Sequence, residues 1–471
     1  MTWNKVQLLA KLCADSKSLT QAKLLNGSII ILGFQDHVEL RRNLFKLYFS
    51  CRSYDYAESV LEVAGKPLKI VWWNSLMSTY CKNVRYSKTL DLFAKLLKNP
   101  LMEPDHFSYS STLKACGALG RVKDGSALHA RLIKSQMLAG TVVASSLSGM
   151  YGKCRMLTEC LQVFDEIPKK DVSSWNEVIS SFYHNGEAEQ ALTIFEKMKK
   201  SGFIPSSETV TTAICACARL LDVKRGMQIH EDLEKDRIVS DHYISSALVN
   251  LYAKCGYLEK CKEVFEVMPV KTVAAWNSII SGFSHQLING ECFKLFVRMI
   301  MEGNTPNLTT LTIMLSACSR SSELHYGKFV HGLVIKSRWE VDAFINSALI
   351  DLYFNCGQPQ SAENVFQSLA YPDVACWNAM IHGYAQVGLS SIALDTYYRM
   401  KAASVKPNAI TYASVLSACS KSASLEKGRE IHISIVEDGL ENDAVIRGAL
   451  LDMYGKCGAV DQANDIFLKA T

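Results

Sequence analysis

Tyr252-Ala253-Lys254-Cys255-Gly256 is the stretch that decides the fold, because its cysteine returns at a fixed interval along the chain. Cysteines stand at positions 154, 255, 356 and 457, each 101 residues after the last. The same step of 101 residues separates further series: Cys116, Cys217, Cys318 and Cys419; Trp175, Trp276 and Trp377; and His129, His230, His331 and His432. Chance does not produce several independent series with one step, so the chain is an array of repeats.

Each period divides into three units of 35, 35 and 31 residues, for example 273–307, 308–342 and 343–373. Each unit is typical of two antiparallel helices. In the last unit Ala449, Leu450, Met453 and Tyr454 recur at helical spacing, and Gly458 follows where a C-terminal cap would stand. Prolines close several units, at Pro168, Pro269 and Pro372. Two short helices cannot bury their apolar faces alone, so neighbouring units must stack.

Composition agrees with an extended core. The 471 residues are 48% hydrophobic and 21% charged, with a formal charge of +5, which permits nucleic-acid binding without demanding it. No apolar run approaches the roughly 18 residues that cross a bilayer, so we expect no membrane association. Sixteen cysteines spread over so long a chain suggest a reducing compartment. The start, with four lysines, no arginine and Asp15, is a poor transit peptide and is expected to be folded structure.

The motifs Trp175-Asn176, Ser316-Ala317-Cys318 and Tyr252 to Gly256, with the terminal Pro-Asp or Pro-Asn pairs, resemble the PLS subclass of plant pentatricopeptide repeat proteins. The resemblance implies an all-α fold, a right-handed α-solenoid superhelix of stacked helix-turn-helix repeats that alternate as P, L and S types. It also implies these parts: degenerate L and S repeats at 3–69, then P-L-S triplets at 70–171, 172–272, 273–373 and 374–471, the last S repeat being incomplete.

In that family the fifth residue of a repeat and its last residue, here called the reader pair, together read one RNA base. Asn presents a donor and an acceptor to a pyrimidine edge, and a Ser or Thr hydroxyl suits a purine. The resemblance carries the following reader pairs onto this chain: Asn74 with Asp105 (U), Ser145 with Asp171 (G), Asn176 with Ser206 (a pyrimidine, C favoured), Ser246 with Thr272 (a purine), Asn277 with Asn307 (C over U), Ser347 with Asp373 (G) and Asn378 with Asn408 (C). The L-type pairs carry no assignment: Ser110 with Gly140, Thr211 with Asp241, Thr312 with Asp342 and Ala413 with Asp443.

The resemblance thus predicts an RNA that runs 5′ to 3′ as U-n-G-Y-n-R-Y-n-G-Y. A phosphate track is expected near the ends of the first helices, at Lys82, Lys153, Arg219, Lys254, Arg320, Lys421 and Lys456. The second residue of a P-type repeat commonly sandwiches the base. Val71 fits that role, whereas Ser173, Ala274 and Ala375 are small, which is expected to weaken binding.

The expected function is sequence-specific single-stranded RNA binding in an organelle, the mitochondrion ahead of the chloroplast, as the target-recognition factor for C-to-U editing. Any deaminase would act in trans, because His37-Val38-Glu39 has no downstream C-x-x-C to complete a zinc deaminase signature. The chain is expected to be no enzyme, to need no cofactor or metal, and to bind no DNA. Two alternatives stay open: an RNA stabilisation, splicing or translation factor, and a protein-binding scaffold of the tetratricopeptide type.

Three serial residue types have a second interpretation. The cysteines could bind metal, but none of them forms a C-x-x-C pair, so helix packing is favoured. The histidines could form an acid–base ladder, yet each lacks a repeated carboxylate partner. Trp73, Trp175, Trp276 and Trp377 precede the reading asparagines and could stack on bases, although adjacent helical positions point about 100° apart, which favours the core.

Overall fold

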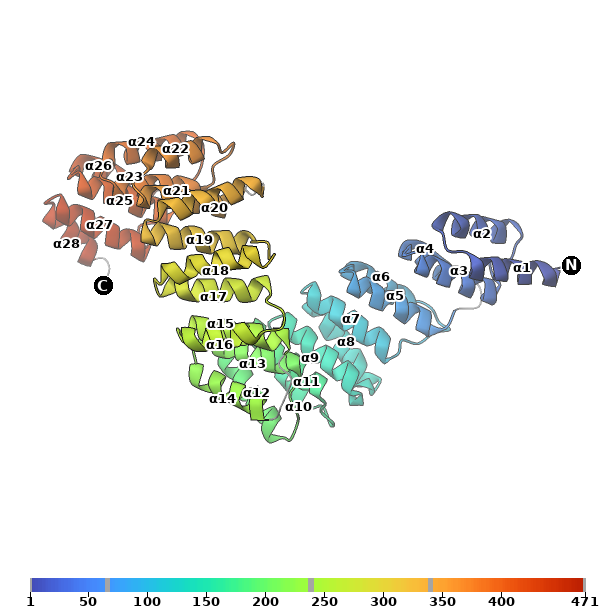
Figure 1. The fold of residues 1–471 in the computed structure, drawn as a ribbon. Helices are drawn as coiled ribbons and strands as arrows, with labels where there is room; N and C mark the ends of the chain where they lie inside the picture. The colour runs from blue at the N-terminus through green and yellow to red at the C-terminus, as the bar shows by residue number, and fades with distance from the viewer. Residues whose placement is uncertain (1, 64–67, 236–240, 338–341, 469–471) are drawn as a thin grey trace. The chain divides into compact units, whose positions relative to one another are not determined.

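Helices alone make up the computed structural model, which describes residues 2–63, 68–235, 241–337 and 342–468 (Figure 1). Over those residues there are 28 α-helices, one short 3-10 helix and no strand, so the all-α prediction is confirmed. None of these helices is both long enough and apolar enough to cross a bilayer. The helices belong to two compact units, 1–232 and 233–471, which are considered separately.

The first unit is built from helix pairs in chain order. Its helices are α1 (Thr2–Asp15), α2 (Leu19–Ile31), α3 (Val38–Ser50), α4 (Tyr54–Glu62), α5 (Ile70–Lys82), α6 (Tyr86–Leu97), α7 (His106–Ala118), α8 (Val122–Lys134), η1 (Met137–Ala139), α9 (Thr141–Lys153), α10 (Leu157–Asp165), α11 (Val172–His184), α12 (Ala188–Lys200), α13 (Ser207–Leu220) and α14 (Val223–Lys235), in which the unit boundary falls. The start of the chain is therefore helical, as expected.

The second unit continues the same pattern. Its helices are α15 (His242–Lys254), α16 (Leu258–Val267), α17 (Val273–His285), α18 (Asn289–Met301), α19 (Leu308–Ser321), α20 (Leu324–Lys336), α21 (Ala343–Asn355), α22 (Pro359–Gln367), α23 (Val374–Gln386), α24 (Ser390–Ala402), α25 (Ala409–Lys421), α26 (Leu425–Glu437), α27 (Ala444–Lys456) and α28 (Val460–Leu468). Helices begin at 70, 172, 273 and 374, where the P-type repeats were expected to start; the grouping into triplets stays a prediction.

Most first helices begin at a side-chain cap supplied by the last residue of the repeat before; α3, α5 and α9, which follow His37, Lys69 and Gly140, lack such a cap. Asp171, for example, accepts a hydrogen bond from the backbone N–H of Ser174, whose hydroxyl accepts one from the backbone N–H of Asp171. This reciprocal capping box satisfies two backbone donors that a helix start otherwise leaves unpaired. The same box opens α7, α13, α19 and α25.

From α4 onward the second helix of a repeat begins differently, two residues after a left-handed residue that reverses the chain. Gly256, Gly357 and Gly458 follow the serial cysteines and have φ of 80°, 68° and 74°. Glycine adopts this conformation without strain. In the first S-type repeat Arg155 holds it instead, with φ 64°.

Aromatic residues join the second helix of one repeat to the first helix of the next. Trp175, Trp276 and Trp377 are at most 6% exposed, and each meets a phenylalanine edge to face, with ring centroids 4.7, 4.6 and 4.6 Å apart. Trp73 is 3% exposed. The tryptophans therefore lie in the core, and the prediction that they pack rather than stack on bases is confirmed.

Within each unit, successive first helices contact one another directly. The contacts join α5, α7, α9, α11 and α13 in the first unit and α15 through α27, by odd numbers, in the second. Among the described residues no two successive second helices are in comparable contact. Each unit is therefore tighter along its row of first helices, and the surface of that row is called the inner face below.

Candidate nucleic-acid interface

The reader pairs of the four P-type repeats are each joined by a hydrogen bond. The amide nitrogen of the fifth residue donates to the side chain of the last residue, with Nδ2 to oxygen distances of 2.9 Å in each of the first two repeats and 3.1 and 3.2 Å in the next two. The pairs are Asn74 with Asp105, Asn176 with Ser206, Asn277 with Asn307 and Asn378 with Asn408. Residues about 30 positions apart in sequence are thus brought together four times.

The last residue of each pair has a second task, because it also caps the next first helix. Asn307 Oδ1 accepts from Asn277 Nδ2 at 3.1 Å and from the backbone N–H of Thr310 at 3.0 Å. Asp105 Oδ1 accepts from the backbone N–H groups of Phe107 and Ser108 at 3.1 and 2.9 Å. The capping bonds fix the side chain of the last residue to the helix start.

The amides differ in how open they are. Asn74, Asn176 and Asn277 are partly exposed, whereas Asn378 is only 7% exposed. Part of the surface of the first three is open to solvent. Asn378 is largely covered by its surroundings, which the sequence did not predict.

A third residue joins each asparagine, and sequence reasoning missed it. A hydroxyl on the third residue of the next repeat's first helix donates to the asparagine Oδ1. These hydroxyls belong to Ser108, Thr209, Thr310 and Thr411. The signal was available, because these four residues also stand 101 positions apart.

The S-type reader pairs are looser. Ser246 Oγ and Thr272 Oγ1 lie 3.3 Å apart. Ser347 Oγ donates to the carbonyl of Phe344 within its own helix at 3.1 Å, and Asp373 accepts from the backbone N–H of Cys376. The Ser145 hydroxyl is buried and, over the described residues, has no hydrogen-bond partner, while Asp171 caps α11.

The L-type positions have local partners of other kinds. Ser110 Oγ lies 2.6 Å from Ser146 Oγ, and Thr312 Oγ1 donates to the carbonyl of Leu308 at 2.9 Å. Thr211 Oγ1 is buried and has no partner in the described part of the chain. The last residues Asp241, Asp342 and Asp443 each accept from two backbone N–H groups at the start of the following helix.

The seven basic residues of the expected phosphate track are all exposed, but four of them are engaged within the protein. Arg219, Arg320 and Lys421 reach back to the last turn of the preceding P-type first helix, where they donate to Tyr183 O (2.8 Å), Ser284 Oγ (2.5 Å) and Ala385 O (2.9 Å). Cations at this end of a helix are favoured by its dipole. Lys456 pairs with Asp452. For Lys82, Lys153 and Lys254 the described residues supply no hydrogen bond or ion pair.

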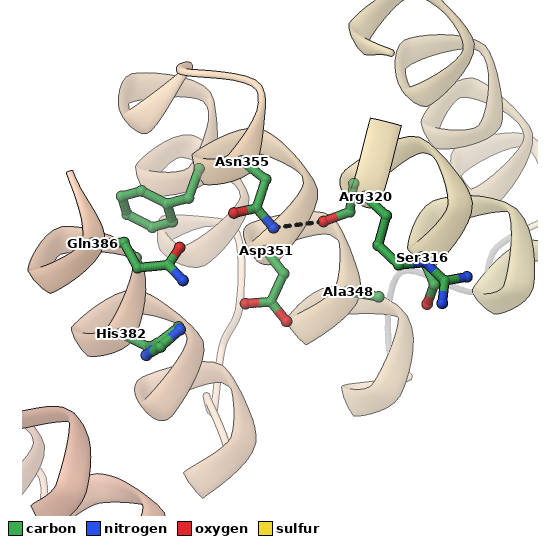
Figure 2. A pocket seen from close by; sticks show the side chains of 10 residues that line it. Ser316, Arg320, Ala348, Asp351, Asn355, His382 and Gln386 are labelled. Carbon is green, nitrogen blue, oxygen red and sulfur yellow. Dashed lines mark hydrogen bonds between the residues drawn. The ribbon is translucent and has the colours of Figure 1, made fainter. Parts of the chain in front are cut away.

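A pocket of about 390 Å³ opens on the inner face between α19, α21 and α23 (Figure 2). Arg320 and Ser316 reach it from α19, Asp351 from α21, and His382 from α23. Burial raises the pKa of Asp351, and His382 nearby partly offsets the rise. On the rim Asn355 Nδ2 donates to Ser319 Oγ at 2.7 Å (Figure 2). This acidic group lies on a surface expected to meet RNA, and no sequence pattern pointed to it.

The serial cysteines and histidines have structural roles. Cys116, Cys217, Cys318 and Cys419 are buried, as expected, but the second series is only partly buried, because it lies at the C-terminal ends of first helices. Burial raises the pKa of Cys318 to about 12, so its thiol stays protonated. His129, His331 and His432 place Nδ1 2.9, 2.7 and 2.9 Å from a tyrosine hydroxyl on the next first helix. Within the described residues no three His, Cys, Asp or Glu side chains are grouped as a metal site.

Comparison with known proteins agrees with this arrangement. Models of the PPR repeat family match residues 170–219, 271–320 and 372–421, and PPR repeat models match 73–101, 142–172 and 243–273. The first set of matches steps by the same 101 residues that separate the cysteines.

Relatives extend the likeness along the chain. A pentatricopeptide repeat-containing protein of Arabidopsis thaliana is 45% identical over 99% of this chain and 68% of its own length. A mitochondrial and a chloroplastic member from the same plant are each 29% identical over 97% and 98% of this chain, which spans only 59% and 57% of them. The crystal structure of a pentatricopeptide repeat protein from maize aligns with a TM-score of 0.53 at 15% identity, over 99% of this chain and 88% of that one, a likeness of fold alone.

The repeated helix pairs, the helix starts capped by the preceding repeat and the 45% identity along 99% of the chain lead to one conclusion. This chain belongs to the pentatricopeptide repeat family.

Proposed function

We propose that the chain binds single-stranded RNA sequence-selectively, each P-type repeat reading one base through its asparagine amide. The observation that carries the proposal is the recurrence of one polar constellation at four P-type repeats: an Asn amide held between the last residue of its repeat and a hydroxyl of the next. Fixed short donors and acceptors at even intervals suit the edges of unpaired bases.

The first reader pair is complementary to uracil. Asn74 Nδ2 lies 2.9 Å from both carboxylate oxygens of Asp105. These oxygens lie too close together to take both amide hydrogens linearly, so one N–H remains available. Asp105 Oδ1 is used in capping and Oδ2 is left as an acceptor. An N–H beside an acceptor oxygen matches a carbonyl beside the N3–H of uracil.

The third P-type pair is complementary to cytosine. Asn307 Oδ1 accepts hydrogen bonds from Asn277 Nδ2 and from the backbone N–H of Thr310. The Nδ2 hydrogens of Asn307 then remain available beside the second N–H of Asn277. Two neighbouring donors match the N3 and O2 acceptors of cytosine. Asn378 with Asn408 repeats this arrangement with a more covered amide.

A binding panel tests the proposal. The full chain is titrated with labelled UAGCAACAGC, which follows the proposed pattern, and with UACGAAGACG, a decamer in which the G and Y positions are exchanged. Tighter binding of the first RNA by at least about tenfold is expected, a difference of about 1.4 kcal/mol. Equal dissociation constants would rule the proposal out, and equal weak binding of both would favour a protein-binding scaffold.

A change of one reader pair tests the assignment of positions. Asn277→Thr with Asn307→Asp should shift the preference of that repeat from cytosine to guanine. The matched control is the base facing Asn176 and Ser206, whose preference should stay unchanged. A variant that still prefers cytosine at the altered repeat contradicts the register.

We further propose that the bound RNA is organellar and that the chain selects targets for C-to-U editing, with a deaminase supplied in trans. Support comes from the P, L and S alternation and from the mitochondrial and chloroplastic relatives. Crosslinking in plant organelles followed by sequencing would identify the RNA. Transcripts that contain edited cytidines are expected among the bound RNAs; bound transcripts without them would favour RNA stabilisation, splicing or translation instead.

A further inference from the structure

The hydroxyl that joins each asparagine has only one proton to donate. Ser108 Oγ lies 2.7 Å from Asn74 Oδ1 and 3.1 Å from Asp105 Oδ1. Thr310 Oγ1 lies 2.7 Å from Asn277 Oδ1 and 2.9 Å from Asn307 Oδ1. The shorter contact is to the asparagine in both cases.

In the last P-type repeat the hydroxyl is again closer to the fifth-residue asparagine than to the last residue. Its oxygen also accepts a hydrogen bond. Thr411 Oγ1 is 2.6 Å from Asn378 Oδ1 and 3.0 Å from Asn408 Oδ1. It also accepts from the backbone N–H of Asn408 at 3.0 Å. All four hydroxyl residues are at most 1% exposed, so water does not compete for these bonds. The hydroxyl therefore accepts from the cap and donates to the asparagine.

The hydroxyl occurs where the preceding fifth residue is asparagine. After the L-type repeats, whose fifth residues are Ser, Thr or Ala, the equivalent helix position is a buried aliphatic residue: Val143, Ile244, Ile345 or Ile446. Ser174 is the informative exception. It stands after an S-type repeat and forms a capping box, but its hydroxyl donates to the Asp171 carbonyl at 2.7 Å and serves the cap alone.

We infer that these four hydroxyls are positioning residues for base recognition, setting which end of each asparagine amide faces the base. An amide can rotate by half a turn and exchange its donor for its acceptor. The hydroxyl proton holds Oδ1 inward, so the outward group is N–H. That donor suits the O2 acceptor of a pyrimidine, whereas an outward oxygen would suit the N1–H of guanine. The inference deepens the proposed function and rests on it.

The test compares Thr310→Val, Thr310→Ser and Ser174→Ala in the full chain, using RNAs that differ only at the base facing Asn277. Thr310→Val keeps the shape of the side chain and removes the proton, so the preference for C over G should fall by about tenfold, the equivalent of one hydrogen bond. Thr310→Ser should restore it. Ser174→Ala loses a capping-box hydroxyl of the same kind and should leave the preference at every position unchanged.

The outcomes separate this inference from the proposed function. A Thr310→Val protein that is destabilised like Ser174→Ala but keeps the wild-type C over G preference would overturn the inference and leave RNA reading intact. A wild-type chain without any preference at the Asn277 position would overturn both. Loss of preference in Thr310→Val, with recovery in Thr310→Ser, supports the inference, because a cap alone does not alter base choice.

Discussion

Asp351 places a negative charge on the inner face of α21, between Arg320 on α19 and His382 on α23 (Figure 2). Its side chain is open to solvent, yet its carboxyl sits among the pocket walls, which raises its pKa. A carboxylate on this surface opposes the approach of a phosphate backbone. The pocket is thus one place on the inner face where charge and proposed function disagree.

Removing that charge is expected to strengthen RNA binding. Asp351→Asn should lower the dissociation constant at pH 8 by up to about fivefold, the value of one partly screened charge pair. The advantage should shrink as pH falls, because a raised pKa lets the wild-type carboxyl take up a proton at a higher pH than an ordinary aspartate does. Anisotropy titrations from pH 8 to pH 5 measure both effects. A wild-type and variant difference that is constant over this range would contradict the assignment.

At the residue scale, the sequence predicted the four P-type reader pairs, whose side chains meet in the structure, but not the hydroxyls that hold them. The pairing of Asn277 with Asn307 was implied by the family resemblance, and the structure joins the two side chains by a hydrogen bond. The role of the Thr310 hydroxyl was missed although its position recurs every 101 residues, because a threonine near a helix start is ordinarily explained as a cap. The near-complete burial of Asn378 depends on how neighbouring helices pack, which no local pattern encodes.

At the scale of the helix, side-chain volumes are matched across each S-to-P junction. A Cβ added to Gly383 on α23 would lie 2.1 Å from the Phe354 ring on α21. One period earlier Gly282 faces Ala253, and two periods earlier Ser181 faces Gly152. At each of these three junctions one of the two facing residues is glycine, and at Gly383 that glycine makes room for a phenylalanine ring.

This matching predicts a coupled pair. Gly383→Ala should destabilise the second unit by about 1–3 kcal/mol, since the phenylalanine must move out of a well-packed site. In a Phe354→Ala background the same change should cost little. Denaturant unfolding of the four proteins of the cycle gives the coupling free energy. A cost for Gly383→Ala that is equal in both backgrounds would show that the contact is not limiting.

Arg155 occupies the left-handed position that glycine holds in the three later S-type repeats. A side chain in this conformation costs about 1–2 kcal/mol. Arg155→Gly is therefore expected to stabilise the first unit by about 1 kcal/mol, and Gly357→Ala to destabilise the second by a similar amount. No atom lies near the added methyl of Gly357, so backbone strain alone is tested there. Thermal unfolding measures both; a lower melting temperature for Arg155→Gly would refute the strain.

At the scale of the whole molecule, the fold was the most predictable property. A period of 101 residues, divided into units with helical spacing, requires stacked hairpins whatever the details of each repeat. The partition of the inner-face cations was not predictable. Three cations stand at the same helix position as Lys82: Arg219, Arg320 and Lys421. Unlike Lys82, each has a hydrogen-bond partner on the preceding first helix, 36 residues earlier in the sequence.

This partition lowers the expected salt dependence of RNA binding. If only Lys82, Lys153 and Lys254 release counterions, the slope of log K against log salt should be roughly −2, rather than the roughly −5 of all seven cations. Titrations between 50 and 300 mM salt give the slope. Lys153→Gln should make the slope less negative by about 0.7. Arg320→Gln should mainly lower the stability of the fold, because the hydrogen bond to Ser284 is lost. A slope near −5 in the wild type would show that the engaged cations exchange partners on binding.

The last residue of each P-type repeat both caps the next first helix and pairs with the asparagine, and this limits how the sequence of such a chain can change. Asp105, Ser206, Asn307 and Asn408 belong to the small group of side chains that start helices well. If the chain has the proposed function, the substitutions that could change its RNA preference at these positions are therefore limited to residues that also cap helices. A substitution outside them would unsettle the adjoining hairpin before any new target could be gained.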